Sequence, residues 1–154
     1  MVVRSILTPQ RVKVPLQATA KEDAIRELVD LLADSGDVTD RDEVLKAVLE
    51  REQTRTTGIG NGLAVPHGKT SAVPELVMAV GKPAEALDFS SVDGRPVELV
   101  ILLVSPKDKT GPHIRALARI ARMLSVDTVR RKLYGAQTAD ALYEHFIANE
   151  DAGF

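Results

Sequence analysis

The sequence has no cysteine, no tryptophan, and only two tyrosines and three phenylalanines among its 154 residues. Without cysteine the chain can form no disulfide, no thiolate nucleophile and no sulfur-ligated metal site. With so few aromatic rings and a formal net charge of −2, it also lacks the basic, ring-bearing surface that binds nucleic acid. Nitrogen and oxygen groups must therefore carry any chemistry, and nucleic acid is not an expected partner.

Long hydrophobic runs are also missing. The longest one, residues 99–104, is far shorter than the roughly 20 residues that a membrane-spanning helix needs. The N-terminus lacks the charged-then-apolar pattern of a signal peptide. We therefore expect a cytoplasmic protein without direct membrane insertion, and its hydrophobic fraction of 44% and charged fraction of 27% are typical of one globular domain.

Five stretches carry apolar residues at helical spacing, at about residues 19–36, 39–52, 110–124, 127–134 and 138–148. Thr19 and Glu22 have the spacing of a capping box, Thr39 opens the second helix, and Pro112 suits the first turn of the third. His113 then lies at the N-terminal end of that helix. The positions expected to face a core are Ile25, Leu28, Val29, Leu32, Val44, Leu45, Val48, Leu49, Ile114, Leu117, Ala118, Ala121, Leu124, Leu142, Phe146 and Ile147.

Short β-rich runs alternate with these helices. Residues 12–14, ended by Pro15, and residues 63–65, 76–80 and 97–104 are strand-like. The last run is so continuously apolar that both of its faces should be covered, as in an inner strand. The pattern predicts an α/β fold, a single-domain sandwich in which a mixed parallel/antiparallel β-sheet is flanked by helices on both faces.

The segment of residues 57–70 concentrates glycines ahead of a short strand that ends at Pro66 and His67. Pro66 fixes its own φ and keeps the preceding residue extended, so His67 should be held at a strand end. Gly68 leaves backbone room for a bulky anion, and its amide is a possible donor. A neutral imidazole is a nucleophile near physiological pH, and these are the requirements of a phosphoryl acceptor.

Spacing alone leaves alternatives open. His67 can equally be a loop histidine whose neighbouring glycines only form turns. A P-loop is excluded because Leu63 stands where that motif needs glycine, and a dinucleotide loop because the glycines lead into a strand instead of a helix. His67, His113 and His145 have no short ligand spacing, so a metal site is not expected, and His145 is interpreted as structural.

Glu52 followed by the run Ile-Gly-Asn-Gly-Leu-Ala-Val-Pro-His-Gly at residues 59–68 resembles the active-site signature of the fructose/mannitol class of phosphotransferase-system IIA domains. Arg51 precedes His67 by 16 positions and His113 follows it by 46, and both spacings agree with that family. The resemblance implies one domain over residues 1–154. It also implies that His67 is the phosphoryl acceptor, that Arg51 orients the phosphate, that His113 assists as a hydrogen-bond donor, and that a phosphate loop contains Gly60, Gly62, Pro66 and Gly68.

The resemblance further implies a relay that needs no cofactor and no metal. The small phosphocarrier protein HPr would be the donor, and a IIB domain or a regulatory target protein the acceptor. The motif residues look most similar to the nitrogen-regulatory branch, but a sugar-transport IIA component shares much of the signature and stays open as the alternative. Arg55 and Thr56 depart from the small residue expected shortly before Thr57, which concerns details of the acceptor loop.

Overall fold

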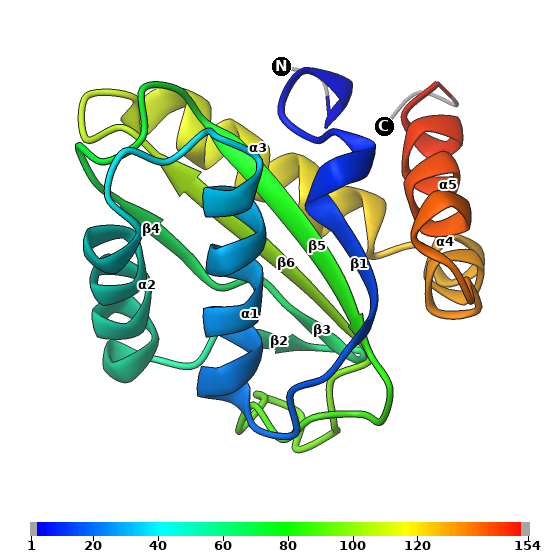
Figure 1. Ribbon diagram of the computed structural model, residues 1–154. Helices are drawn as coiled ribbons and strands as arrows, with labels where there is room; N and C mark the ends of the chain where they lie inside the picture. Colours follow the sequence, from blue (N-terminus) through cyan, green and yellow to red (C-terminus); the bar gives the residue numbers. More distant parts are fainter. Residues whose placement is uncertain (1–2, 152–154) are drawn as a thin grey trace.

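A mixed sheet of six strands forms the centre of the molecule, and helices cover both of its faces (Figure 1). The computed structural model describes residues 3–151. The strands are β1 (Val12–Leu16), β2 (Gly58–Gly60), β3 (Leu63–Ala64), β4 (His67–Lys69), β5 (Val77–Pro83) and β6 (Leu99–Ser105). The prediction of an α/β sandwich with a mixed sheet is confirmed.

Strand β6 is the central strand of the sheet. It runs antiparallel to β5 on one side and parallel to both β3 and β4 on the other, while β1 pairs with β5 and β2 with β3. All seven residues of β6 are buried, as the continuous apolar run predicts for an inner strand. Pro15 does not end β1 but lies inside it, which is tolerated because β1 is an edge strand and one N–H side is unpaired.

The helices divide between the two faces. Helices α1 (Lys21–Asp34) and α2 (Arg41–Thr54) pack on one face, and α3 (Thr110–Met123), α4 (Asp127–Tyr134) and α5 (Ala139–Asp151) on the other (Figure 1). Two 3₁₀ turns, Val3–Ser5 and Pro9–Arg11, precede β1. Among the described residues, no helix is long and apolar enough to cross a membrane.

The predicted helix starts are partly wrong. Ala20 is the N-cap of α1 and no side chain caps it, so Thr19 and Glu22 form no capping box. Asp40 caps α2 in place of Thr39, and its carboxylate accepts the Glu43 N–H at 3.2 Å. The predicted core residues of α1 are all buried, because burial of the apolar stripe and not the cap sequence decides where the helix packs.

Helix α3 is rotated relative to the prediction. The side chains that it buries are His113, Ala116, Ile120 and Met123, whereas the predicted Ile114 is 59% exposed. The sequence of this helix contains two apolar stripes at helical spacing, and the packed stripe includes a histidine that a count of apolar residues passes over. The rotation places His113 against the sheet and leaves Ile114 on the surface.

Candidate functional site

His67 lies where the edge of the sheet is interrupted. Strands β3 and β4 both run parallel to β6, with Leu63 opposite Leu99 and His67 opposite Leu103. Pro66 lies in the gap between them, and its carbonyl accepts the Leu103 N–H at 3.1 Å. His67 therefore begins the short strand β4 instead of ending a finished strand, which corrects the prediction; Pro66, which has no N–H, breaks the ladder.

The turn ahead of β3 has three consecutive residues in the left-handed region, Gly60, Asn61 and Gly62, with φ of 105°, 58° and 80°. Glycine is required at both ends because a Cβ there would be strained and would approach neighbouring side chains. Two contacts fix the asparagine between them: its N–H donates to Asp93 at 2.9 Å, and its carbonyl accepts the Tyr134 hydroxyl at 2.7 Å. The turn is thus held from two separate segments.

Gly68 is needed for close packing. A Cβ at this position would lie 3.2 Å from the backbone nitrogen of Val48 and 3.3 Å from the carbonyl carbon of Ala47. The space that a Cβ would occupy is therefore taken by helix α2. The glycine allows α2 to pack closely against β4, directly next to His67.

One nitrogen of the His67 ring is engaged. Nδ1 lies 2.8 Å from the carbonyl oxygen of Val65, and since a carbonyl can only accept, Nδ1 carries the proton. In the neutral ring the lone pair is then on Nε2. Burial lowers the pKa of His67, the bond to Val65 raises it, and the positive charges of Arg51 and Lys69 lower it, so the net lowering favours the neutral, nucleophilic ring.

A pocket of about 350 Å³ opens beside this ring. It is lined by Arg51, Arg55, Thr56, Thr57, Ile59, Val65, His67, Val92, Leu117 and Ala121. One Arg51 nitrogen donates to the Arg55 carbonyl at 2.9 Å, which leaves further guanidinium N–H groups for another acceptor. The structure therefore brings the predicted Arg51 and His67 to the same pocket.

His113 packs against the same histidine from helix α3. The two ring centroids are 5.4 Å apart and the planes are tilted by 59°. His113 Nδ1 and the Ser105 hydroxyl form a buried hydrogen bond of 2.6 Å. Burial and the neighbouring His67 and Lys69 lower the pKa of His113 to about 4, so this ring is neutral near pH 7.

The helix start around His113 leaves its backbone N–H engaged. Helix α3 begins at Thr110, as predicted, and the His113 N–H donates to the Lys109 carbonyl at 3.1 Å. This backbone N–H is therefore not free for an anion. Any contribution of His113 to phosphate binding has to come from its imidazole, which is 5% exposed.

Three large apolar side chains are exposed near the site. Val92 is 72% exposed, Ile114 59% and Ile59 50%. Val92 and Ile59 line the His67 pocket, and Ile114 follows His113 on α3. The loop carrying Val92 is fixed because its N–H donates to the Gly58 carbonyl at 3.0 Å. Exposed apolar side chains held in place around a pocket are typical of a protein-docking surface.

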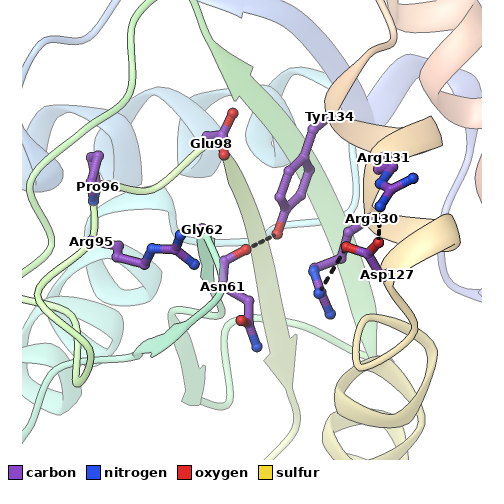
Figure 2. Close-up of a pocket in the computed structure, with 9 residues that line it drawn as sticks. All are labelled: Asn61, Gly62, Arg95, Pro96, Glu98, Asp127, Arg130, Arg131 and Tyr134. Carbon is purple, nitrogen blue, oxygen red and sulfur yellow. Dashed lines mark hydrogen bonds and ion pairs between the residues drawn. The ribbon is translucent and has the colours of Figure 1, made fainter.

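A second pocket, of about 520 Å³, is lined by residues of the Asn61 turn and of α4 (Figure 2). Its arginines are partly neutralised, since Asp127 forms ion pairs with Arg130 at 3.3 Å and with Arg131 at 2.5 Å. Figure 2 shows the Tyr134 ring reaching from α4 to the turn. No histidine lines this pocket, whereas the smaller pocket combines His67 with Arg51 and Arg55.

Within residues 3–151, no group of three or more His, Cys, Asp or Glu side chains could hold a metal ion. His145 lies on α5, away from the residues that line the His67 pocket. The sequence does not indicate Ser105 or Val92, because nothing in the local pattern marks a hydroxyl at the end of a strand or an exposed loop valine as part of a distant site.

Comparison with known proteins decides the family. The model for "Phosphoenolpyruvate-dependent sugar phosphotransferase system, EIIA 2" matches residues 5–149. The chain belongs to this EIIA family. Its members are phosphotransfer components of the phosphotransferase system, as the resemblance of residues 59–68 implies.

Relatives of two kinds match the EIIA chain over most of its length. A fructose-specific EIIA component of Haloferax volcanii is 36% identical over 91% of this chain and 92% of the relative. A nitrogen regulatory protein of Bradyrhizobium diazoefficiens is 34% identical over 93% of both. A fructose-specific EIIABC component of Bacillus subtilis is 33% identical over 94% of this chain, which spans only 23% of that longer protein.

The EIIA fold recurs in solved structures. The nitrogen regulatory protein IIA-Ntr of Neisseria meningitidis superposes with a TM-score of 0.85 at 26% identity, covering 92% of this chain and 97% of the other. IIA mannitol of Escherichia coli, solved in complex with phosphorylated IIB mannitol, gives a TM-score of 0.78 at 24% identity, covering 92% and 97%. The second likeness shows the fold alone.

Proposed function

We propose that this EIIA protein is a phosphocarrier that takes a phosphoryl group onto Nε2 of His67 and passes it on. The observation that carries the proposal is the 2.8 Å contact between His67 Nδ1 and the Val65 carbonyl. It leaves Nε2 as the nucleophilic nitrogen beside a pocket that also contains Arg51. Residues 1–154 are taken as one IIA domain, in line with the family match over residues 5–149.

The transfer balances as a direct exchange between two imidazoles. The bond between phosphorus and the donor's histidine nitrogen breaks as the bond to His67 Nε2 forms, and the electron pair stays with the donor nitrogen. The Nδ1 proton remains hydrogen-bonded to the Val65 carbonyl. The guanidinium of Arg51 and the ammonium of Lys69 stabilise the oxygens of the moving group, since both charges act on His67.

The proposed donor is phosphorylated HPr, and the proposed acceptor is a IIB domain or a regulatory target protein. The mannitol complex has a IIA and a phosphorylated IIB as partners, and the same roles are proposed here. Of the two branches we favour the nitrogen-regulatory one, in which the phosphate on His67 is a signal. The fructose-specific relatives support the alternative, a sugar-transport IIA component that relays phosphate to IIB.

The test is reconstitution of the relay. Phosphoenolpyruvate, enzyme I and HPr are mixed with the protein, and the intact mass is measured under non-acidic conditions because the N–P bond is acid-labile. We expect the mass of one phosphoryl group to be added. Chasing the labelled protein with IIB domains then separates the branches: rapid loss to a fructose-type IIB supports transport, whereas retention supports the regulatory role. No added mass would reject the proposed function.

Arg51→Ala should slow phosphoryl acceptance by about tenfold to a hundredfold, because a planar charge-assisted donor to the transferred group is lost. The melting temperature should hardly change, since the lost contact is one exposed hydrogen bond to the Arg55 carbonyl. The measurement is the labelling rate from phosphorylated HPr. Arg26→Ala on α1, which loses an exposed pair with Asp23, is the control, and a wild-type rate for Arg51→Ala would show that its charge is not used.

Val92→Asp should weaken docking of HPr. Val92 is 72% exposed at the rim of the His67 pocket, so the new charge costs little folding stability but replaces an apolar contact in the interface by a hydrated carboxylate. We expect the KM for phosphorylated HPr to rise about tenfold with kcat nearly unchanged. Ala148→Asp, the same added charge on an exposed position of α5, is the control. Equal KM values for both variants would place the interface elsewhere.

A further inference from the structure

Glu52 is a buried carboxylate near the end of α2 that does not line the His67 pocket. It is 4% exposed, and both of its oxygens accept hydrogen bonds from Thr57: Oε2 from the backbone N–H at 2.7 Å and Oε1 from the hydroxyl. The Lys21 ammonium lies 3.7 Å from Oε2. A carboxylate is expensive to bury, so a contact with two donors of one residue suggests that the position of Thr57 matters.

Two further hydrogen bonds lead from Thr57 to the acceptor. The Thr57 carbonyl accepts the Val65 N–H at 3.0 Å. The Val65 carbonyl in turn accepts the proton of His67 Nδ1 at 2.8 Å. Glu52, Thr57, Val65 and His67 therefore form a continuous series of contacts in which the carboxylate anchors one end and the reactive ring lies at the other.

We propose that Glu52 is a positioning residue: it holds Thr57, and through it the Val65 carbonyl, where that carbonyl fixes the ring orientation and the Nδ1–H tautomer of His67. This inference rests on the proposed function of His67 as the phosphoryl acceptor. Without the anchor, the Val65 carbonyl can move away from Nδ1, and the ring can then place its proton on Nε2. That tautomer has no lone pair on the nitrogen that attacks.

The local backbone makes the anchor necessary. Between α2 and β3 the chain has only the short strand β2, whose pairing with β3 is irregular between Gly58 and Gly60. The bonds to β6 are made by the Gly62 and Pro66 carbonyls, so the Val65 N–H faces the other neighbour and donates to the Thr57 carbonyl. On that side Thr57 contacts Val65 directly, and Thr57 in turn is held by Glu52.

The experiment uses Glu52→Gln in the full chain. Glutamine has the same size but only one acceptor oxygen and no charge. Its NH₂ group can contact the Thr57 hydroxyl only as a donor, so the two charge-assisted hydrogen bonds from Thr57 are replaced by weaker neutral ones. The tautomer of His67 is measured by ¹⁵N NMR at about pH 8, where a histidine of ordinary or lowered pKa is neutral. We expect a mainly Nδ1–H ring in the wild type and a substantial Nε2–H population in the variant. We also expect kcat for phosphoryl acceptance to fall about tenfold with KM unchanged.

Thr57→Ser and Thr57→Val extend the test in case Glu52→Gln fails to fold. The serine variant keeps both donors to Glu52 and should retain the wild-type tautomer and rate, whereas the valine variant loses the hydroxyl and should shift both. Lys21→Gln leaves the Glu52–Thr57 contacts in place and should leave the tautomer unchanged. A wild-type tautomer in folded Glu52→Gln or Thr57→Val would overturn the proposal.

The two proposals fail separately. The NMR measurement needs no phosphoryl donor, so a protein that gains no phosphate from HPr would refute the acceptor role of His67 while the tautomer result still decides whether Glu52 positions the ring. Conversely, wild-type labelling together with an unshifted tautomer in Glu52→Gln would refute only the positioning role.

Discussion

Replacement of His67 by Ala is expected to abolish phosphoryl incorporation from phosphorylated HPr while leaving the fold intact. The ring supplies the only proposed nucleophile. The two hydroxyls among the residues that line the pocket are already engaged as donors, that of Thr56 to the Phe89 carbonyl and that of Thr57 to the buried Glu52 carboxylate. The backbone ladder between β4 and β6 does not depend on the side chain, so β4 should still form. The measurement is intact mass under non-acidic conditions, with circular dichroism to check folding.

His145→Ala is the matched control for this loss. His145 is also a partly buried histidine, but it lies on α5, outside the pocket. This variant should gain one phosphoryl group at the wild-type rate, and peptide mapping should place the group on His67. Full labelling of His67→Ala would contradict the assignment of the acceptor.

Much of the fold follows from hydrophobic periodicity. The run at residues 99–104 predicts the central strand because a strand covered on both faces needs apolar residues on both, and β6 is buried throughout. Helix α4 has the predicted bounds, since Val129 and Leu133 at helical spacing lie between clear breaks. Sheet order, however, depends on contacts between distant segments that no local pattern encodes.

The error in α3 has a physical origin in the residue types. Ile114, Leu117 and Ala121 form a more hydrophobic stripe than the one containing His113, so periodicity favours burying the wrong side. The protein accepts a buried histidine there because Ser105 satisfies its Nδ1. The apolar stripe that the core does not bury contributes to the site. Leu117 and Ala121 line the His67 pocket, and Ile114 is exposed on the same stripe of the helix.

Of the candidate site, only the residues that belong to the family signature were predictable from the sequence. The resemblance of residues 59–68 indicates His67, and the spacings of Arg51 and His113 to it agree with the family. The partners of these residues were not predictable. The bond from Ser105 to His113 and the bond from Tyr134 to Asn61 join segments that only the folded sheet brings together, and neither residue type carries a signal by itself.

His113 is expected to change its protonation state when His67 is phosphorylated. In the free protein burial, with smaller effects of His67 and Lys69, holds the pKa of His113 at about 4. A phosphoryl dianion on the adjacent ring, whose centroid is 5.4 Å away, favours the imidazolium and raises that pKa. Between about 4 and the raised value, arrival of the phosphate is therefore coupled to proton uptake, and a lower pH within that window stabilises the phosphorylated form.

The lowered pKa of His113 also makes the free energy of unfolding depend on pH. The pKa of His113 is lower in the folded protein than the ordinary value of 6.5, so between about pH 6.5 and 4 the unfolded chain binds a proton that the folded one does not. The free energy of unfolding should fall as the pH is lowered through this range. Phosphorylation should reduce that fall, because it brings the folded pKa closer to the unfolded one.

NMR titration of the His113 ring with and without phosphate on His67 measures the coupling directly. In His113→Gln the side chain keeps an N–H donor but cannot become cationic. His67 of this variant should still accept phosphate, and the phosphate should be lost about tenfold faster than in the wild type. Ser105→Ala leaves the ring in place but removes the partner of its Nδ1, so the titration should still show an upward shift. A pKa that does not rise on phosphorylation would rule out proton coupling, and phosphate mapped to His113 in the wild type would reverse the roles of the two histidines. If the pKa rises and the phosphate stays on His67, His113 acts through its charge, and the low pKa in the free protein is what keeps an unpaired cation out of the core until the phosphate arrives.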